Sequence, residues 1–166
     1  MKNIYLVRHA KSSWEFELSD FDRPLNERGH SDAKAMAQLF GHLKADFFIT
    51  SSAQRTISTA HYFAHELQFN ENLIKKTKDL YLASKIEILN QIQNLDNQYN
   101  TVFLFGHNPG ISDFTFDLAE NGDFIGEMPT CSVIHLEFKE NDWKKFSKKT
   151  TTLKQKWCPK KDLSPA

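Results

Sequence analysis

The sequence has few of the features that mark membrane proteins, secreted proteins or nucleic-acid-binding proteins. It contains two cysteines in 166 residues and has a formal net charge of +0. No apolar run approaches the ~20 residues that a membrane-spanning helix needs. Nothing in the balanced charge suggests binding to nucleic acid or to a membrane surface. We therefore expect neither a nucleic-acid partner nor a membrane partner.

Cysteine is too scarce for a disulfide framework. Cys131 and Cys158 stand alone, and the residues after Met1 enter a strand pattern directly, without the apolar segment of a signal peptide. Two cysteines in such a chain are typical of free thiols in a reducing compartment. The sequence predicts a cytoplasmic protein.

Arginine is also rare, and its positions are informative. The chain has four arginines against seventeen lysines, so lysine serves wherever charge alone is needed. Two of the four, Arg8 and Arg55, lie beside predicted strand ends. Because the guanidinium is a rigid fork of donors that suits oxyanions, this placement favours recognition of an anion over solubility.

Predicted strands and helices alternate along most of the chain. Apolar runs predict strands at residues 4–7, 47–50, 73–77, 101–105 and 131–138. Helical spacing of apolar residues predicts helices at residues 27–44, 53–68, 84–97 and 109–118, with Asn26 as a cap and a capping box at residues 84–87. The alternation predicts a single-domain α/β fold over residues 1–166, a three-layer α/β/α sandwich with a mainly parallel central sheet. A further strand is expected at residues 143–153 and a loose tail at 154–166, which leaves a core of about residues 1–153.

Polar side chains follow three of the predicted strands at the point where each ends. Arg8 and His9 follow the first strand, Arg55 lies in the first turn of the helix after the second, and His107 follows the strand at 101–105. The carboxyl ends of parallel strands share one edge of the sheet, where ligands bind. A cation in the first turn of a helix is opposed by the helix dipole unless an anion binds there. Two guanidiniums and two imidazoles at this edge predict a site for a dianion, and phosphate fits it most directly.

These motifs resemble those of the histidine phosphatase superfamily, the phosphoglycerate mutase-like proteins, whose signature is Arg-His-Gly after the first strand. The match here is LVRHA at residues 6–10, with Ala10 in place of the usual glycine. Three more matches follow in the family's order: RPLNERG at 23–29, TSSAQRT at 50–56 and GHNP at 106–109. The compact length and the start at Arg8 look most like the SixA-type phosphohistidine phosphatases. The resemblance implies a phosphoglycerate mutase-like fold.

The resemblance also implies roles for individual residues. His9 would be the nucleophile and form a phosphohistidine intermediate, while Arg8, Arg55 and His107 would hold the phosphoryl oxygens, without metal or other cofactor. Asp79 is the nearest positional match to the family's general acid. For this chemistry we expect His9 to be neutral, with its other nitrogen donating to a backbone carbonyl, and His107 to be protonated.

The function expected from these residues is removal of a phosphoryl group from phosphohistidine in a protein, within signal transduction. Two alternatives stay open: a phosphatase of the same superfamily that hydrolyses small phosphomonoesters, and a phosphate-binding module without turnover. A phosphorylated protein or a small phosphoester is therefore the expected partner. Binding alone would not require the nucleophile His9 beside both arginines.

Other kinds of phosphate site lack their motifs. A cysteine-based phosphatase needs an arginine six residues after its cysteine, and Cys131 is followed at that distance by Glu137. Neither a Walker loop nor a dinucleotide glycine fingerprint is present. His61 and His65 are one helical turn apart, but no carboxylate-rich motif accompanies them, so we expect no metal site.

Overall fold

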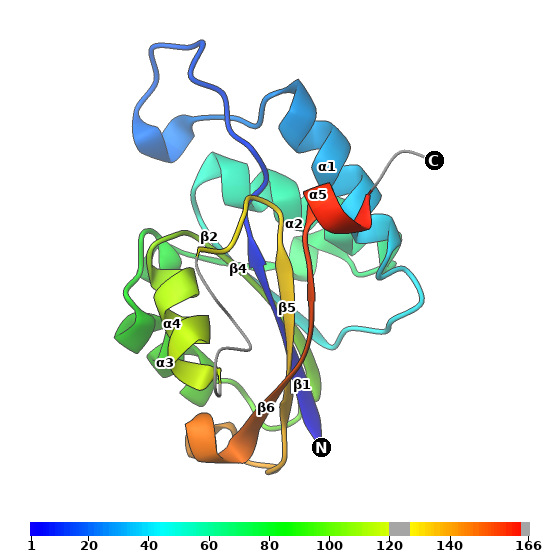
Figure 1. Ribbon diagram of the computed structural model, residues 1–166, viewed down its shortest axis with the longest axis vertical. Coiled ribbons are helices and arrows are strands. Elements are labelled where there is room, and N and C mark those ends of the chain that lie inside the picture. The colour runs from blue at the N-terminus through cyan, green and yellow to red at the C-terminus, as the bar shows by residue number, and fades with distance from the viewer. Residues whose placement is uncertain (120–126, 164–166) are drawn as a thin grey trace.

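A computed structural model of the chain describes residues 1–119 and 127–163 (Figure 1). Its strands are β1 Lys2–Arg8, β2 Phe47–Ser51, β3 Lys75–Thr77, β4 Thr101–Gly106, β5 Val133–Phe138 and β6 Thr151–Trp157. They form one sheet in the order β3-β2-β4-β1-β5-β6. The first four strands in sequence run parallel, while β5 pairs antiparallel with β1 and β6 pairs antiparallel with β5. The prediction of a mainly parallel sheet is confirmed.

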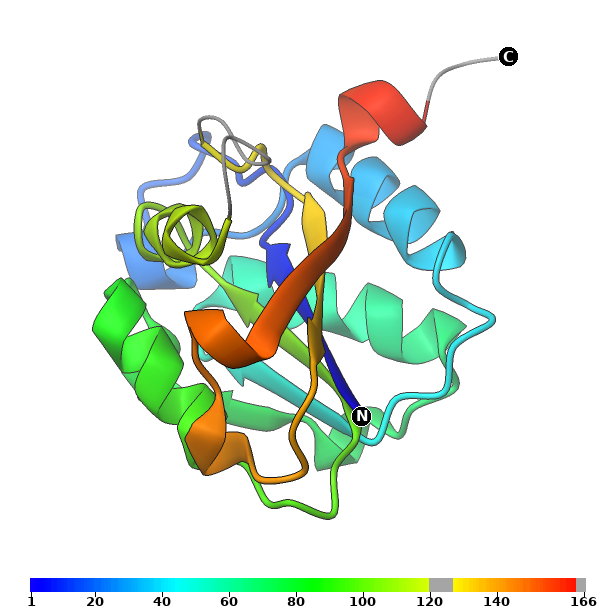
Figure 2. The same ribbon diagram turned by 60° about the horizontal axis from the view of Figure 1, so that its bottom comes forward.

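Helices cover both faces of this sheet. They are α1 Glu27–Gln38, α2 Gln54–Glu66, α3 Lys85–Gln93, α4 Gly110–Leu118 and the short α5 Pro159–Asp162. Helices α1 and α2 lie on one face and α3 and α4 on the other, as Figures 1 and 2 show. Alternate residues of β1 serve the two faces, because successive side chains of a strand point to opposite sides. Leu6 packs in the core with Ile88 of α3, and Val7 in the core with Met36 of α1. The three-layer α/β/α prediction is confirmed.

Two of the predicted helix starts are made as expected. The Asn26 side chain accepts the backbone N–H of Gly29 at 2.7 Å, and Ser84 and Glu87 form a reciprocal capping box. The other two helices begin within one residue of the predicted positions 53 and 109, since α2 begins at Gln54 after Ala53 and α4 at Gly110 after Pro109. Neither helix has a side-chain cap: Ser51 contacts His107, and the Asn108 side chain bonds to Ser112 and to the Met128 carbonyl.

The C-terminal part of the chain corrects the sequence prediction. Residues 143–153 are not one strand, because 3-10 turns at Trp143–Lys145 and Lys148–Thr150 precede β6. The two turns bury Trp143 and Phe146 in the core, which a continuous exposed strand would not do. The tail is not loose from residue 154 either, since β6 continues to Trp157 and α5 follows; residues 164–166 lie outside the described part. The Trp157 ring packs edge-on against Phe40 at 4.8 Å, and this contact holds the chain end to the core.

Within the described residues, no helix is both long and apolar enough to cross a membrane. Cys131 is buried, Cys158 is partly buried, and both are free, as the scarcity of cysteine predicted.

The start of α1 packs closely against the loop that follows β1, which makes Gly29 sensitive to substitution. A Cβ at Gly29 would lie 2.0 Å from the Lys11 carbonyl oxygen, whereas one at Gly41 would meet its nearest neighbour at 3.5 Å. We expect Gly29→Ala to lower the free energy of unfolding by about 1–3 kcal/mol, the usual cost of overpacking. Gly41→Ala should change it by less than about 1 kcal/mol. Urea unfolding of both variants measures the difference, and equal stabilities would contradict the close packing of loop and helix.

Candidate active site

His9 lies directly after β1, and its protonation follows from its contacts. Its Nδ1 is 2.7 Å from the carbonyl oxygen of Ala10. A carbonyl only accepts hydrogen bonds, so Nδ1 carries the proton and Nε2 keeps its lone pair. Burial, together with the charges of Arg55 and Arg8, lowers the pKa of His9 to about 3. His9 is therefore a neutral imidazole whose Nε2 is available as a nucleophile, and the predicted bond to a backbone carbonyl is confirmed.

His107 follows β4 and lies beside His9, with 5.2 Å between the ring centroids. Its Nε2 is 2.8 Å from Ser51 Oγ, which already accepts the backbone N–H of Ala53 at 3.2 Å. Ser51 can donate its hydroxyl hydrogen to Nε2, and in that tautomer the imidazole proton lies on Nδ1. That nitrogen is buried and has no hydrogen-bond partner among the described residues.

The expectation that His107 is protonated is wrong. Burial lowers the pKa of His107 to about 3, and the adjacent His9 and Arg55 add to the shift. Both histidines are consequently neutral in this structure. A neutral His107 still has one N–H to donate, so its place beside His9 is compatible with binding an oxyanion.

Two arginines complete the cluster. Arg55, in the first turn of α2, is buried and directs its Nε toward His9 Nε2 at 3.4 Å. Arg8, at the end of β1, donates from Nη1 to the Met128 carbonyl at 2.8 Å, while its buried Nε has no partner among the described residues. A buried donor left unpaired costs about 1–3 kcal/mol. Arg8 Nε and His107 Nδ1 are thus two donors that an oxyanion would satisfy.

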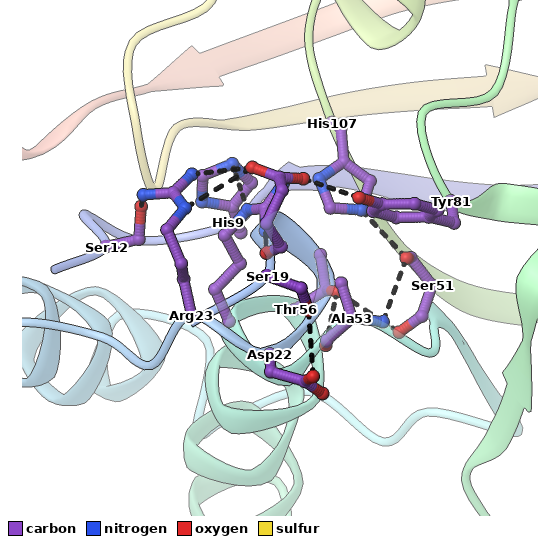
Figure 3. A network of polar contacts seen from close by, with 12 residues as sticks. His9, Ser12, Ser19, Asp22, Arg23, Ser51, Ala53, Thr56, Tyr81 and His107 are labelled. Carbon is purple, nitrogen blue, oxygen red and sulfur yellow. Dashed lines mark hydrogen bonds and ion pairs between the residues drawn. The ribbon is translucent and has the colours of Figure 1, made fainter. Parts of the chain in front are cut away.

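Asp20 joins this cluster from the loop at residues 10–26, and the sequence analysis did not single it out. It lies on the 3-10 turn η1, Asp20–Asp22, and its carbonyl and carboxylate accept Arg55 Nη1 at 2.6 Å and Nη2 at 3.0 Å. The Tyr81 hydroxyl donates to the same carboxylate at 2.5 Å (Figure 3). Burial raises the pKa of Asp20, but the hydrogen bonds from Tyr81 and Arg55 outweigh it and lower the pKa to about 2. Asp20 is therefore ionised and pairs with Arg55.

Arg23 is a third arginine at this site. It is buried, donates to Ser12 Oγ at 2.6 Å and forms an ion pair with Asp20 at 3.1 Å. The scarcity of arginine pointed to Arg8 and Arg55, and the structure adds Arg23 to them. The fourth, Arg28, pairs with Asp32 on the exposed side of α1.

The structure thus brings together Arg8, His9, Arg55 and His107, and leaves Asp79 outside the cluster. Asp79 is exposed on the 3-10 turn η3, Lys78–Leu80, where its backbone N–H donates to Thr77 Oγ1. Within the described residues its carboxylate makes no hydrogen bond or ion pair with the four. A general-acid role for Asp79 stays a prediction.

No group of three or more histidine, cysteine or acidic side chains in the described part of the chain is placed to hold a metal ion. His61 and His65 line a shallow surface depression on α2 together with Lys34, Tyr62 and Glu66.

The depressed pKa values of the two histidines make stability depend on pH. Below the ordinary histidine pKa of 6.5 the unfolded chain binds protons that the folded chain excludes until about pH 3. Stability contributed by each histidine is therefore complete above about pH 6.5 and is lost as the pH falls, by up to about 1.4 kcal/mol per pH unit. We expect His107→Gln to lose stability less steeply than the wild type, by roughly 1 kcal/mol per unit between about pH 6 and pH 4. Urea unfolding across this range tests the prediction, and parallel slopes would contradict it.

Comparison with known proteins shows what the chain is similar to. The model of the histidine phosphatase superfamily (branch 1) matches residues 4–80. An uncharacterized chloroplastic protein of Arabidopsis thaliana is 28% identical over 153 residues, which are 86% of this chain and 69% of that protein. Its name gives no activity.

Two solved structures share the fold. SixA from Agrobacterium tumefaciens superposes with a TM-score of 0.79 at 24% identity, covering 95% of this chain and 98% of that one. The protein histidine phosphatase SixA in complex with tungstate superposes with a TM-score of 0.80 at 17% identity, covering 98% and 99%. The fold is therefore phosphoglycerate mutase-like and of the SixA type. The N-terminal part of the chain, which carries Arg8, His9 and Arg55, therefore resembles the histidine phosphatase superfamily, and the whole chain shares the fold of the SixA structures.

Proposed function

We propose that this chain is a phosphatase of the histidine phosphatase superfamily, which removes the phosphoryl group from phosphohistidine in a protein through a covalent intermediate on His9. One observation carries the proposal: a neutral His9 lies beside two buried donors without partners among the described residues, on Arg8 and His107. The Ala10 carbonyl holds the proton of His9 on Nδ1, so Nε2 keeps its lone pair. A nucleophile and oxyanion donors in one pocket are the two requirements of phosphoryl transfer.

The proposed reaction has two steps at phosphorus. His9 Nε2 attacks the phosphorus atom, a bond from Nε2 to phosphorus forms, and the bond to the substrate's nitrogen breaks. Arg8, Arg55 and His107 donate hydrogen bonds to the phosphoryl oxygens, where charge accumulates. The Ala10 carbonyl stabilises the His9 ring as its phosphorylated form becomes cationic. Water then attacks phosphorus, releases His9 and gives inorganic phosphate, with the proton passing to solvent.

The acid–base properties of the site favour a nitrogen leaving group. The ionised Asp20, with its pKa of about 2, has no proton to donate, and Asp79 does not contact the cluster. An alkoxide leaving group must be protonated as it departs, whereas an imidazole can leave already protonated. These contacts support phosphohistidine over a phosphomonoester as substrate.

Further features fit this proposal. The SixA structure holds tungstate, which like phosphate is a tetrahedral oxyanion. Two arginines supply the positive charge that a metal ion would otherwise bring, so we propose a metal-independent reaction. Free cysteines agree with a reducing compartment, and we propose the cytoplasm on this basis. The role in signal transduction is proposed from the phosphohistidine substrate alone.

Replacement of His9 tests its proposed role as nucleophile. His9→Ala should lower single-turnover hydrolysis of a phosphohistidine-bearing protein by about 10⁴-fold or more, because the covalent route is lost. The control is His65→Ala, an exposed histidine near the end of α2, which should keep wild-type turnover. The wild type should also react much faster with phosphohistidine than with para-nitrophenyl phosphate.

Other results would support a different function or mechanism. Preference of the wild type for the ester would support the small-molecule phosphatase, and binding of phosphate without turnover would support a binding module. Activity that survives in His9→Ala would exclude the covalent mechanism.

Asp20 and a bound phosphate would compete for the Arg55 guanidinium. Asp20 occupies both terminal nitrogens of the Arg55 guanidinium and places a negative charge beside the phosphoryl site. We expect Asp20→Asn to bind inorganic phosphate about tenfold more tightly, a modest effect because the carboxylate is partly exposed and screened. Titration calorimetry measures this, with Asp22→Asn, whose carboxylate pairs with Ser19, as the control on the same turn. Weaker phosphate binding would show that Asp20 mainly positions Arg55.

A further inference from the structure

The loop at residues 10–26 carries an unusual group of exposed apolar side chains. Trp14 is 78% exposed, Phe16 56% and Leu18 49%. The described residues contain nine large apolar side chains that are exposed, and three of them lie within these five consecutive positions. Apolar side chains that gather in this way mark interaction sites more often than those scattered singly.

This loop is held against the catalytic cluster. The Trp14 ring lies over the Arg23 guanidinium at 3.5 Å, and Arg23 is bonded to Ser12 and to Asp20. Asp20 in turn accepts two hydrogen bonds from Arg55, and Arg55 donates to His9 Nε2. The loop projects beyond the carboxyl ends of the strands, at the top of Figure 1. A partner that contacts Phe16 and Leu18 would therefore lie beside the cluster around His9.

The charge of the loop indicates what it binds. Glu15, Glu17 and Asp22 lie among or beside the apolar side chains, and residues 14–22 contain no lysine or arginine. A small phosphorylated metabolite is anionic and would be repelled by this rim, with no apolar surface to bury against it. A protein surface with apolar and basic side chains would gain from both features.

We propose that Trp14, Phe16 and Leu18 form a docking surface for a protein substrate that carries its phosphohistidine beside apolar and basic residues. This inference rests on the proposed function and specifies the substrate of the same site. The docking surface supplies affinity and orientation, while the cluster around His9 supplies the chemistry. Phe16 and Leu18 make no hydrogen bond or ring contact with that cluster in the described structure, so they can be changed separately from it.

The test compares three substrates in which the same phosphorus–nitrogen bond of phosphohistidine is broken. They are free phosphohistidine and two peptides of equal length with a central phosphohistidine, one flanked by leucine and lysine and the other by serine and glutamate. We expect the wild type to hydrolyse the leucine–lysine peptide with a kcat/KM about tenfold or more above that for the serine–glutamate peptide. The variant Phe16→Ser/Leu18→Ser should lose this preference, mainly through KM, and keep wild-type turnover of free phosphohistidine.

Two controls separate docking from general effects. Phe116→Ser removes an equally exposed aromatic ring from α4 and should change none of the three rates. Glu15→Lys/Glu17→Lys should lower kcat/KM for the leucine–lysine peptide and raise it for the serine–glutamate peptide, because the charge of the rim is reversed.

The outcomes distinguish this inference from the function on which it rests. No turnover of any phosphohistidine substrate by the wild type would overturn the proposed function, and docking with it. Turnover without preference between the peptides, or equal losses on peptides and free phosphohistidine, would overturn docking alone. A wild-type dimer in sedimentation that becomes monomeric in Phe16→Ser/Leu18→Ser would assign the surface to self-association and also overturn docking.

Discussion

The site depends on the burial of several cationic or potentially cationic groups at one edge of the sheet. Arg55, His9 and His107 lie together away from water, where like charges cannot all persist. The structure resolves this by keeping both imidazoles neutral and by pairing Arg55 with the ionised Asp20. The proposed role of His9 as nucleophile follows from this arrangement, because a neutral His9 with its proton on Nδ1 keeps its Nε2 lone pair unprotonated.

The same constraint relates the chemistry to the substrate. A carboxylate that stabilises Arg55 is ionised and cannot act as a general acid, so the site is better suited to a leaving group that departs without one. The turn that supplies Asp20 also belongs to the loop that exposes Phe16 and Leu18. One segment therefore carries both the carboxylate that pairs with Arg55 and the proposed docking surface.

Local sequence patterns predicted the site residues that lie at or just after strand ends. Arg8, His9, Arg55 and His107 each follow a strand with clear apolar composition, and parallel strands place such residues together by geometry alone. Asp20 and Tyr81 could not be found in this way, because they are 61 residues apart and meet only through the loop and turn that flank the sheet. The protonation of His107 was predicted wrongly for a related reason: burial and neighbouring charges decide it, and neither is visible in a local pattern.

The sequence alone determined the α/β architecture, the parallel core and the four motif residues, because hydrophobic periodicity and strand-end position are local properties. The tertiary structure decided what depends on distant neighbours. It ordered the tail at residues 154–163 through the contact of Trp157 with Phe40. It also buried Lys2, whose amino group is satisfied by the carbonyls of Asn97 and Tyr99. Burial and pairing are set by groups brought together from across the chain, so they exist only once the fold has formed.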